Sequence, residues 1–338
     1  MSLRLKERLL TYLVCPFCAG KLSLTVENAQ NEEIIEGELR CVECNRRFVI
    51  TRGIPRFADL DSVESDKKAT AEGFGWQWKH FTQEDARYGE QFLGWIDPVT
   101  PDFFRGKVVL EGGCGKGRHT QLAATWGAHD VVGIDLSEAV ETAFSATRDL
   151  PNVHIVQADI FQLPFARVFD YAFSVGVLHH LPDPKRGFES LASKVKPGGH
   201  LSAWVYGAEN NEWITSFVNP VREKLTSKID QRALLQLSKI PASCLYLATK
   251  LLYGPLNRSK QGSAIANHLF YNDYLKSIAP FGWREQHTIV FDHLVAPTAF
   301  YLARDEFEVW WKDIQAQAVV ITWHNKNSWR GFGQIPPE

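Results

Sequence analysis

The sequence predicts an α/β protein built on a mostly parallel sheet, with a small cysteine-containing domain in front of it. Three observations support this prediction. Apolar runs that do not alternate with polar residues recur between residues 106 and 206, with helix-like segments between them. A glycine-rich turn follows the first run, and two C-x-x-C pairs precede all of them. Strands that are covered on both faces need no alternation, so this order favours a parallel sheet.

The first strand and its turn contain the most informative motif. Val108–Leu110 reads as a buried strand with Glu111 at its carboxyl end, and three glycines then stand at alternate positions: Gly113, Gly115 and Gly117. A dinucleotide-binding turn needs a third glycine where Arg118 stands, and a phosphate-binding loop needs Lys and Ser or Thr where Arg118 and His119 stand. The pattern that remains is acidic-x-Gly-x-Gly-x-Gly. A purely structural turn in another α/β protein is the alternative.

This pattern resembles the first motif of S-adenosylmethionine-dependent class I methyltransferases, in particular the methyltransferase type 11-like proteins. In that family the glycines pack under the methionine part of the cofactor, and the acidic residue, here Glu111, anchors its ammonium group. The later segments follow the family's order up to about residue 206. The resemblance implies a Rossmann-like sheet, mostly parallel with one antiparallel strand. Residues 317–323 and 331–333 are the candidates for its closing strands.

Further cofactor residues are implied at the ends of the later strands. Asp135 ends the second strand, 24 residues after the first acidic residue, and an acid there can accept both ribose hydroxyls of an adenosine. Its alternative role is that of an acid at a helix start. The resemblance implies that Asp159 receives the adenine amino group and that Ile160 offers a backbone NH. Leu136 and Ser174 complete the predicted cofactor site.

The two C-x-x-C pairs predict a structural zinc site. The four cysteines are Cys15, Cys18, Cys41 and Cys44, with 22 residues between the pairs. Four thiolates complete a tetrahedral zinc site and leave no open position for catalysis. The alternative is two unligated pairs. Residues 8–58 resemble the small zinc-ribbon proteins that partner methyltransferases, here fused at the amino terminus.

We expect three parts along the chain: a zinc ribbon (1–58), a linker with an aromatic helical segment (59–103) and a methyltransferase domain (104–338). Residues 59–70 read as a polar linker. The aromatic stretch that follows, residues 72–81, packs over the cofactor mouth in related methyltransferases. Its alternative is a clasp between the ribbon and the catalytic domain.

An insertion at about residues 207–297 is expected to be helical, with helices at Glu212 to Thr226 and Gln231 to Leu252. In the family, insertions at this point usually form a roof over the acceptor pocket. A packing layer without substrate contact is the alternative, and lipid contact through the apolar stretch is disfavoured because few basic residues flank it.

Composition narrows the class of partner. The chain has 338 residues, 22% of them charged, and a formal net charge of -2, so no global basic field points to nucleic acid. No apolar run reaches the roughly 18 residues of a membrane helix, and no cationic leader with an apolar core opens the chain. Paired cysteines of this kind suit a reducing compartment. We therefore expect a cytoplasmic protein without membrane contact.

Methyl transfer needs positioning more than acid–base chemistry, because the donor is already activated. The candidates for a general base are His179, His180 and Tyr206, which follow the fourth and fifth strands. In the family the paired histidines mostly shape the loop. A lone histidine, His293, is more often structural, and Cys114 reads as a small filler rather than a nucleophile.

The sequence thus favours a methyltransferase that acts by in-line displacement on a small-molecule acceptor. The first alternative is an rRNA or tRNA methyltransferase that binds nucleic acid through its ribbon. The basic residues available for such binding are Lys21, Arg40, Arg46, Arg47, Arg52 and Arg56. The second alternative is a non-catalytic scaffold of the same fold. Neither the acceptor nor the oligomeric state follows from the sequence.

Overall fold

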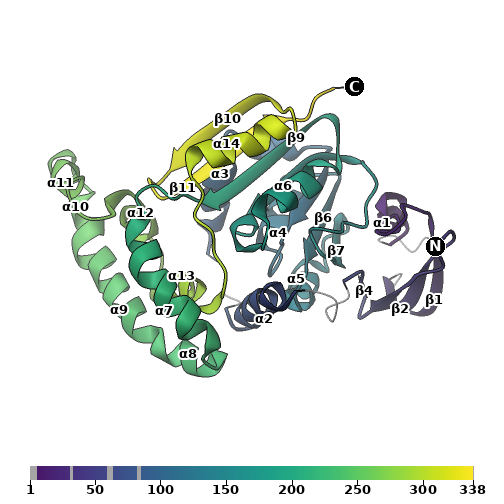
Figure 1. Ribbon diagram of the computed structural model, residues 1–338, viewed down its shortest axis with the longest axis horizontal. Helices are drawn as coiled ribbons and strands as arrows, with labels where there is room; N and C mark the ends of the chain where they lie inside the picture. Colours follow the sequence, from purple (N-terminus) through teal and green to yellow (C-terminus); the bar gives the residue numbers. More distant parts are fainter. Residues whose placement is uncertain (1–5, 31–32, 59–63, 82–84, 338) are drawn as a thin grey trace.

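The computed structural model describes residues 6–30, 33–58, 64–81 and 85–337, which form two sheets and a helical lobe. The small amino-terminal sheet and the helical lobe lie at opposite ends of the molecule, and the large sheet lies between them (Figure 1). A ligand that contacts both the small sheet and the helical lobe must therefore extend along the large sheet.

The small sheet has four antiparallel strands in the order β1-β2-β3-β4. Its elements are α1 (Lys6–Tyr12), β1 (Leu22–Gln30), β2 (Glu33–Cys41), β3 (Arg47–Thr51) and β4 (Ile54–Pro55). The strands bury a small apolar core that includes Ile34, Leu39 and Phe48. The sequence predicts a short amphipathic helix over residues 1–14; the structure has α1 within this range, and residues 1–5 lie outside the described residues.

The ribbon is fixed to the edge of the large sheet by backbone bonds and ion pairs. Phe57 N donates to Gln157 O at 2.8 Å, next to a parallel bridge between Arg56 and Gln157. The Arg56 guanidinium pairs with Glu141 and, at 3.4 Å, with Glu138. Only 13% of the Arg56 side chain is exposed, so water screens these pairs less than it would at the surface.

The large sheet has seven strands in the order β10-β11-β9-β8-β5-β6-β7. Its strands are β5 (Val108–Gly112), β6 (Asp130–Asp135), β7 (Val153–Gln157), β8 (Phe169–Val175), β9 (Val195–Tyr206), β10 (Gln317–His324) and β11 (Ser328–Gln334). Among these, β11 is antiparallel to both neighbours, and the other pairings are parallel. The predicted sheet with one antiparallel strand is confirmed.

Helices cover both faces of this sheet. One face packs against α3 (Tyr88–Ile96), η1 (Pro101–Phe104), α4 (Arg118–Thr125) and α5 (Ala139–Thr147). The other packs against α6 (Pro184–Ala192) and α14 (Arg304–Asp313). Burial on both faces explains why the central strands show no polar alternation.

The helical lobe lies between β9 and α14. Its segments are η3 (Ile214–Val218), α7 (Asn219–Lys224), η4 (Thr226–Lys228), α8 (Gln231–Leu237), α9 (Lys239–Ala248), η5 (Thr249–Tyr253), α10 (Gly254–Leu256), α11 (Lys260–Ala266), α12 (Asn272–Ile278) and α13 (Trp283–Val295). Helix α13 packs against α8, α9 and α2 (Ser65–His80), which joins the lobe to the sheet domain. Within the described ranges, every helix is too short or too polar to cross a membrane.

Both long helices predicted for the insertion are present, but each contains a π-helical turn. These turns are η3 and η5, and each ends two residues before a proline, Pro220 and Pro255. Proline has no backbone NH to donate, which favours a local change in the hydrogen-bond pattern. The predicted polar linker is wrong in its second half, because α2 begins at Ser65; residues 59–63 lie outside the described part.

Candidate functional site

A cavity of about 560 Å³ lies where the parallel strands end beneath the helical lobe. This volume is within the usual range for small-molecule and cofactor sites. Its walls come from the glycine turn, the end of β6, the loop after β8, α2, α3 and the helices α12 and α13. Among the described residues that border it, none belongs to the ribbon. The insertion therefore forms part of the cavity wall, and the ribbon does not.

The glycine turn requires its glycines for two different reasons. Gly113, Gly115 and Gly117 all have positive φ angles, of 80°, 52° and 84°. A Cβ on Gly113 would lie 2.3 Å from Val177, and one on Gly115 would lie 2.9 Å from Trp78 Nε1. Both of these glycines border the cavity, whereas Gly117 packs against Ala143 of α5. Two glycines thus shape the cavity, and the third holds two helices together.

Asp135 connects the turn to the cavity. Its carboxylate accepts hydrogen bonds from Gly115 N at 2.9 Å, Ser137 N at 2.8 Å and Ser137 Oγ at 2.7 Å. Burial raises the pKa of Asp135, and the bonds from Ser137 and Gly115 oppose that rise. The side chain borders the cavity together with its neighbour Leu136. A fixed acceptor therefore stands at the end of β6.

Glu111 has buried partners of its own. Only 1% of the residue is exposed, and its carboxylate accepts a hydrogen bond from Thr120 Oγ1 and lies 3.3 Å from His119 Nδ1. Burial lowers the pKa of His119, so this ring tends to be neutral. Glu111 does not border the cavity, although the glycines after it do. In this conformation its carboxylate braces the start of α4.

Asp159 and Ser174 are also engaged with protein groups. Asp159 pairs with the Lys67 ammonium and accepts from Phe161 N at 2.8 Å. Ser174 Oγ is buried and donates to Gly112 O at 2.8 Å. Neither side chain borders the cavity, whereas Ile160 does.

The two predicted histidines have different surroundings. His180 borders the cavity, and its Nδ1 lies 2.7 Å from Thr298 O. A carbonyl can only accept, so Nδ1 carries the proton and Nε2 is the free acceptor. Burial lowers the pKa of His180 to about 3. His179 is fully buried and stacks on Tyr206 at 3.9 Å between centroids, with both ring nitrogens unpartnered among the described residues. Tyr206 itself borders the cavity.

Two further polar residues, Asp292 at the cavity and Arg222 near it, were not predicted from the sequence. Asp292 borders the cavity, accepts from Gln77 Nε2 and has its pKa raised to about 6 by burial. Arg222 on α7 is 1% exposed. The only sequence signal near Asp292 was its neighbour His293, and the local pattern around Arg222 resembles that of a solvent-facing helix. Tertiary packing, which local patterns do not reveal, brings both side chains to the cavity end.

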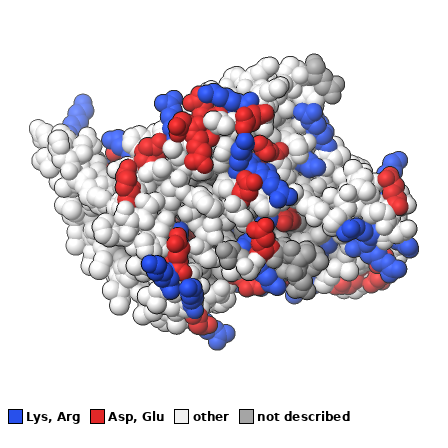
Figure 2. Space-filling view, in the orientation of Figure 1, with Lys and Arg blue, Asp and Glu red and all other residues white. Residues whose placement is uncertain are grey.

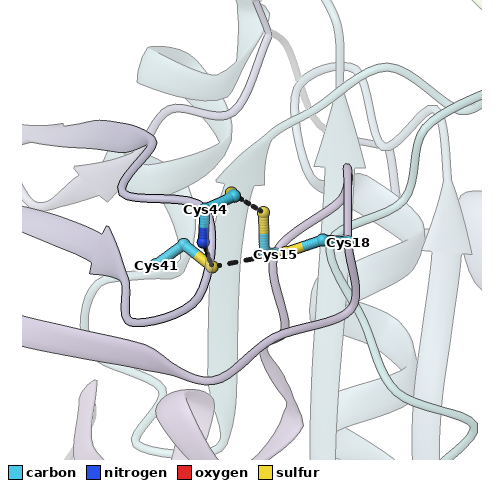
Figure 3. A group of neighbouring side chains, drawn as sticks. All are labelled: Cys15, Cys18, Cys41 and Cys44. Carbon is cyan, nitrogen blue, oxygen red and sulfur yellow. Dashed lines mark hydrogen bonds between the residues drawn. The ribbon is translucent and has the colours of Figure 1, made fainter.

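The four predicted cysteines converge as a zinc site requires (Figure 3). Their ligand atoms all lie within 4.8 Å of one another. The Sγ atoms of Cys15 and Cys44 are 3.6 Å apart, and those of Cys18 and Cys41 are 3.4 Å apart. Tetrahedral zinc with Zn–S of about 2.3 Å implies S···S separations of roughly 3.8 Å, close to these values. Cys44 N also points to Cys41 Sγ at 3.4 Å, which helps to orient that sulfur.

Comparison with known proteins agrees with this geometry. Residues 110–203 match the methyltransferase domain family, and residues 6–53 match the Trm112p-like protein family. A tRNA U34 carboxymethyltransferase from Pseudoalteromonas translucida is 35% identical over 115 residues, which cover 33% of this chain and 34% of that protein. The enzyme of the same name from Aeromonas salmonicida is 29% identical over 186 residues, 54% of this chain and 51% of that protein. The chain thus spans between a third and a half of the curated relatives it matches.

A crystal structure of an S-adenosylmethionine-dependent methyltransferase from Mesorhizobium loti is 28% identical, with a TM-score of 0.29, over 32% of this chain and 54% of that one. The family match over residues 110–203 coincides with the glycine turn and strands β5 to β8, and the second match covers the cysteine cluster. Residues 110–203 are therefore similar to a methyltransferase domain, and residues 6–53, in front of it, are similar to a Trm112p-like protein.

Proposed function

We propose that this protein transfers a methyl group from S-adenosylmethionine to an acceptor bound in the cavity. The observation that carries the proposal is the shared cavity. Its wall contains the glycine turn and Asp135 on the sheet side, and His180, Tyr206 and Asp292 on the side of the lobe. A donor site and an acceptor site that open on one enclosed space meet the geometric need of in-line transfer.

The residues of the turn fit the cofactor. Gly113 and Gly115 would let the methionine part approach the backbone, and Asp135 would accept the ribose hydroxyls. Leu136 and Ile160 border the same space and would flank the adenine. When bound, the cofactor supplies an activated methyl group. The protein's part is then to hold donor and acceptor in line and to keep water out.

The remaining predicted cofactor residues would act through others. Glu111 holds Thr120 and His119, so it would position the turn unless its side chain moved toward the cavity. Asp159 would act through Lys67, because it pairs with the Lys67 ammonium, which borders the cavity. Ser174 would fix the turn through its bond to Gly112 O.

Among groups that border the cavity, Asp292 is suited to take a proton from the acceptor. A raised pKa of about 6 leaves the carboxylate largely ionised at neutral pH and still basic. His180 presents a free Nε2, but its lowered pKa makes it a weak base. Tyr206 has a pKa raised well above its usual range by burial, so it remains a proton donor. His179 lies behind Tyr206 and would support its ring.

We favour a nucleic acid, and tRNA in particular, as the acceptor. The curated relatives are named as tRNA-modifying enzymes, and this outweighs the small-molecule acceptor expected from the sequence. The distance between ribbon and lobe also suits a long acceptor that contacts the ribbon while one base enters the cavity (Figure 1). Basic side chains gather at the ribbon end on the face shown in Figure 2, with acidic ones among them.

A small-molecule acceptor is the second candidate, because one observation favours it. Arg52 and Arg56, two of the six basic residues predicted for RNA contact, pair with Glu138 and Glu141 of the catalytic domain. They stabilise the docked ribbon and are not free for phosphates. The cavity is also partly covered by the lobe, which suits a ligand that is largely enclosed.

Transfer of a radiolabelled methyl group distinguishes the two acceptors. Unmodified bulk tRNA and a mixture of small metabolites are offered separately, with S-adenosylhomocysteine binding measured on the same protein. Labelled tRNA, together with anisotropy that falls as salt rises, supports the nucleic-acid proposal. Label only in small molecules, without salt-sensitive tRNA binding, rejects it. Failure to bind S-adenosylhomocysteine rejects methyl transfer itself and leaves the scaffold alternative.

Arg46→Ala and Lys312→Ala form a matched pair for the binding measurement. Arg46 is exposed on the ribbon, where its guanidinium lies 3.6 Å from the centre of the Phe17 ring. Lys312 is exposed on α14 and pairs only with Glu308 among the described residues. Weaker tRNA binding by the first variant alone would place the RNA on the ribbon.

A further inference from the structure

A buried arginine, Arg222, lies near the lobe end of the cavity, and no acidic residue in the described part of the chain pairs with it. Arg222 is 1% exposed, and its Nε and Nη2 atoms have no hydrogen-bond partner among the described residues. None of the ion pairs between described residues includes Arg222. Burying a charge is costly unless the charge is paired and hydrogen-bonded. An unpaired guanidinium in such a place therefore requires an explanation.

The neighbours of Arg222 are unpartnered too. After burial, the Arg222 charge is a further influence on the pKa values of Tyr301, His179, His180 and His293, which places its guanidinium near these four side chains and within reach of the Tyr301 hydroxyl. In the described structure Tyr301 Oη, His293 Nδ1 and both ring nitrogens of His179 are buried without a partner. Unpaired buried polar atoms are rare in folded proteins. Here several of them share one location, and that points to a ligand.

The chemistry of this cluster selects an anion. Guanidinium and hydroxyl groups donate, and neutral imidazoles can donate without adding charge. Burial lowers the pKa of His293 to about 4, so its ring is neutral at physiological pH. Two cavity carboxylates on α13 have partners of their own, because Asp292 accepts from Gln77 and Glu285 Oε2 accepts from Tyr88, whereas Glu285 Oε1 has no partner among the described residues. The cluster thus carries positive charge and free donors, and no described carboxylate forms an ion pair with Arg222.

The cluster also lies on the acceptor side. Tyr301, His293 and His180 border the cavity, whereas Arg222, on α7 of the insertion, lies behind them and does not border it. Tyr206 stacks on Tyr301 at 5.4 Å and on His293 at 5.6 Å, which holds these rings in place. The donor side, with the glycine turn and Asp135, belongs to the sheet. An anion held here would sit at the end of the cavity that is formed by the lobe.

We propose that Arg222, Tyr301 and His293 form a subsite for an anionic group, a carboxylate or a phosphate, on the acceptor. The proposal rests on the proposed function, since it takes this end of the cavity as the acceptor pocket. Tyr301 and His293 would donate to the anion, with Arg222 supplying the charge beside them.

Arg222→Met tests the subsite, because it removes the charge and keeps an apolar stem. Arg232→Met, on the exposed surface of α8, is the control. Melting midpoints are measured in a buffer of low anion content at constant ionic strength, with inorganic phosphate or acetate added in steps. Wild type and control should gain stability in a saturable way with at least one of the two anions. Arg222→Met should respond roughly tenfold more weakly or not at all.

Without added anion, Arg222→Met should melt at or above the wild-type midpoint, because an uncompensated buried charge has been removed. If phosphate alone raises the midpoint of the wild type, the anionic group of the acceptor is a phosphoryl group. If acetate alone raises it, the group is a carboxylate. The proposal is overturned if neither anion stabilises the wild type, or if Arg222→Met responds as the wild type does. A much lower midpoint of this variant in the absence of anion would also overturn it, since that marks a structural arginine.

Tyr301→Phe provides a second test of the subsite in case Arg222→Met does not fold. It removes one donor and no charge, and it should weaken the anion response several-fold while the midpoint without anion stays close to that of the wild type. An unchanged response would reject Tyr301 as a member of the subsite. S-adenosylhomocysteine binding is followed in parallel. If the wild-type protein does not bind S-adenosylhomocysteine, the proposed function is contradicted. If it binds S-adenosylhomocysteine but is not stabilised by either anion, only the subsite is contradicted.

Discussion

Replacement of Asp135 is the sharpest test of the cofactor assignment. The carboxylate accepts three hydrogen bonds from the protein, from Gly115 N, Ser137 N and Ser137 Oγ. It also borders the cavity, where the proposal places the ribose. Asp135→Asn keeps the shape and one acceptor oxygen but removes the charge. Asp135→Ala removes the acceptors entirely and leaves Gly115 N and Ser137 N without a partner.

The expected loss of affinity follows from the number and kind of bonds. A hydrogen bond to a charged group contributes about 1.5–3 kcal/mol. The asparagine variant weakens the bonds to both ribose hydroxyls but keeps part of each, so we expect a net loss of about 1.4–2.8 kcal/mol. This corresponds to a roughly ten- to hundred-fold higher Kd for S-adenosylhomocysteine. Asp135→Ala should lose at least as much and should also melt at a lower temperature.

Titration calorimetry with S-adenosylhomocysteine measures the effect, and Ser137→Ala provides the control. That variant loses the Ser137 Oγ bond to Asp135 but leaves the carboxylate in place. Its Kd should change less than about threefold, because Ser137 does not border the cavity and the carboxylate keeps its bonds from Gly115 N and Ser137 N. If Asp135→Asn bound within twofold of the wild type, the ribose assignment would be wrong. Equal losses in Ser137→Ala and Asp135→Asn would show that Asp135 acts only through the turn.

Three further outcomes can be measured. Cys41→Ser should lower bound zinc from one ion per chain toward none and increase amide exchange in the ribbon. Cys244→Ser, which changes an exposed free cysteine, should alter neither quantity. Wild-type protein that contains no zinc would refute the site. Gly113→Ala should lower the melting midpoint, since a φ of 80° costs a non-glycine residue about 1–2 kcal/mol and the new Cβ would lie 2.3 Å from Val177; an unchanged midpoint would contradict the turn. Burial raises the pKa of Asp292 from 3.8 to about 6, so the folded state holds this proton to higher pH than the unfolded chain, and stability falls as pH rises through that interval. Asp292→Asn should therefore come closest to the wild type below about pH 4 and exceed its stability by a growing margin up to about pH 7, and parallel melting curves across that range would exclude the shift.

The sheet could be predicted because its signals are local. Val109 and Leu110 are fully buried, and so are Val131 and Val132 on the neighbouring strand. Apolar runs of this kind, each followed by a helix, leave few alternatives to a parallel sheet. The cysteine cluster was equally predictable, because metal geometry constrains the spacing of its ligands. The lengths of the ribbon strands were less predictable: the sequence suggests short strands at Lys21 to Val26 and Glu36 to Leu39, whereas β1 runs to Gln30 and β2 begins at Glu33.

The site was predicted unevenly, and the reason is physical. Asp135 and the glycines lie at strand ends, where the fold itself determines which groups face the cavity. Glu111 shares that position, but nearby donors on α4, which the motif does not specify, hold its carboxylate. Asp292 and Arg222 come from helices of the insertion, 70 residues apart along the chain. Their roles depend on how those helices pack, and no local pattern encodes that packing.

The docked ribbon limits how RNA could bind. Arg56 is mostly buried, and both it and Arg52 are paired with acidic residues of α5 or its start, so neither can release counterions from a phosphate without breaking that contact. The predicted ribbon contacts that remain are Lys21, Arg40, Arg46 and Arg47. With about 0.7–0.9 units of log Kd per log unit of salt for each phosphate contact, these four give a slope of at most roughly 3–4. A steeper slope would require cations outside the ribbon, whereas a slope near zero would leave the enclosed cavity and its anion subsite to select a small acidic acceptor.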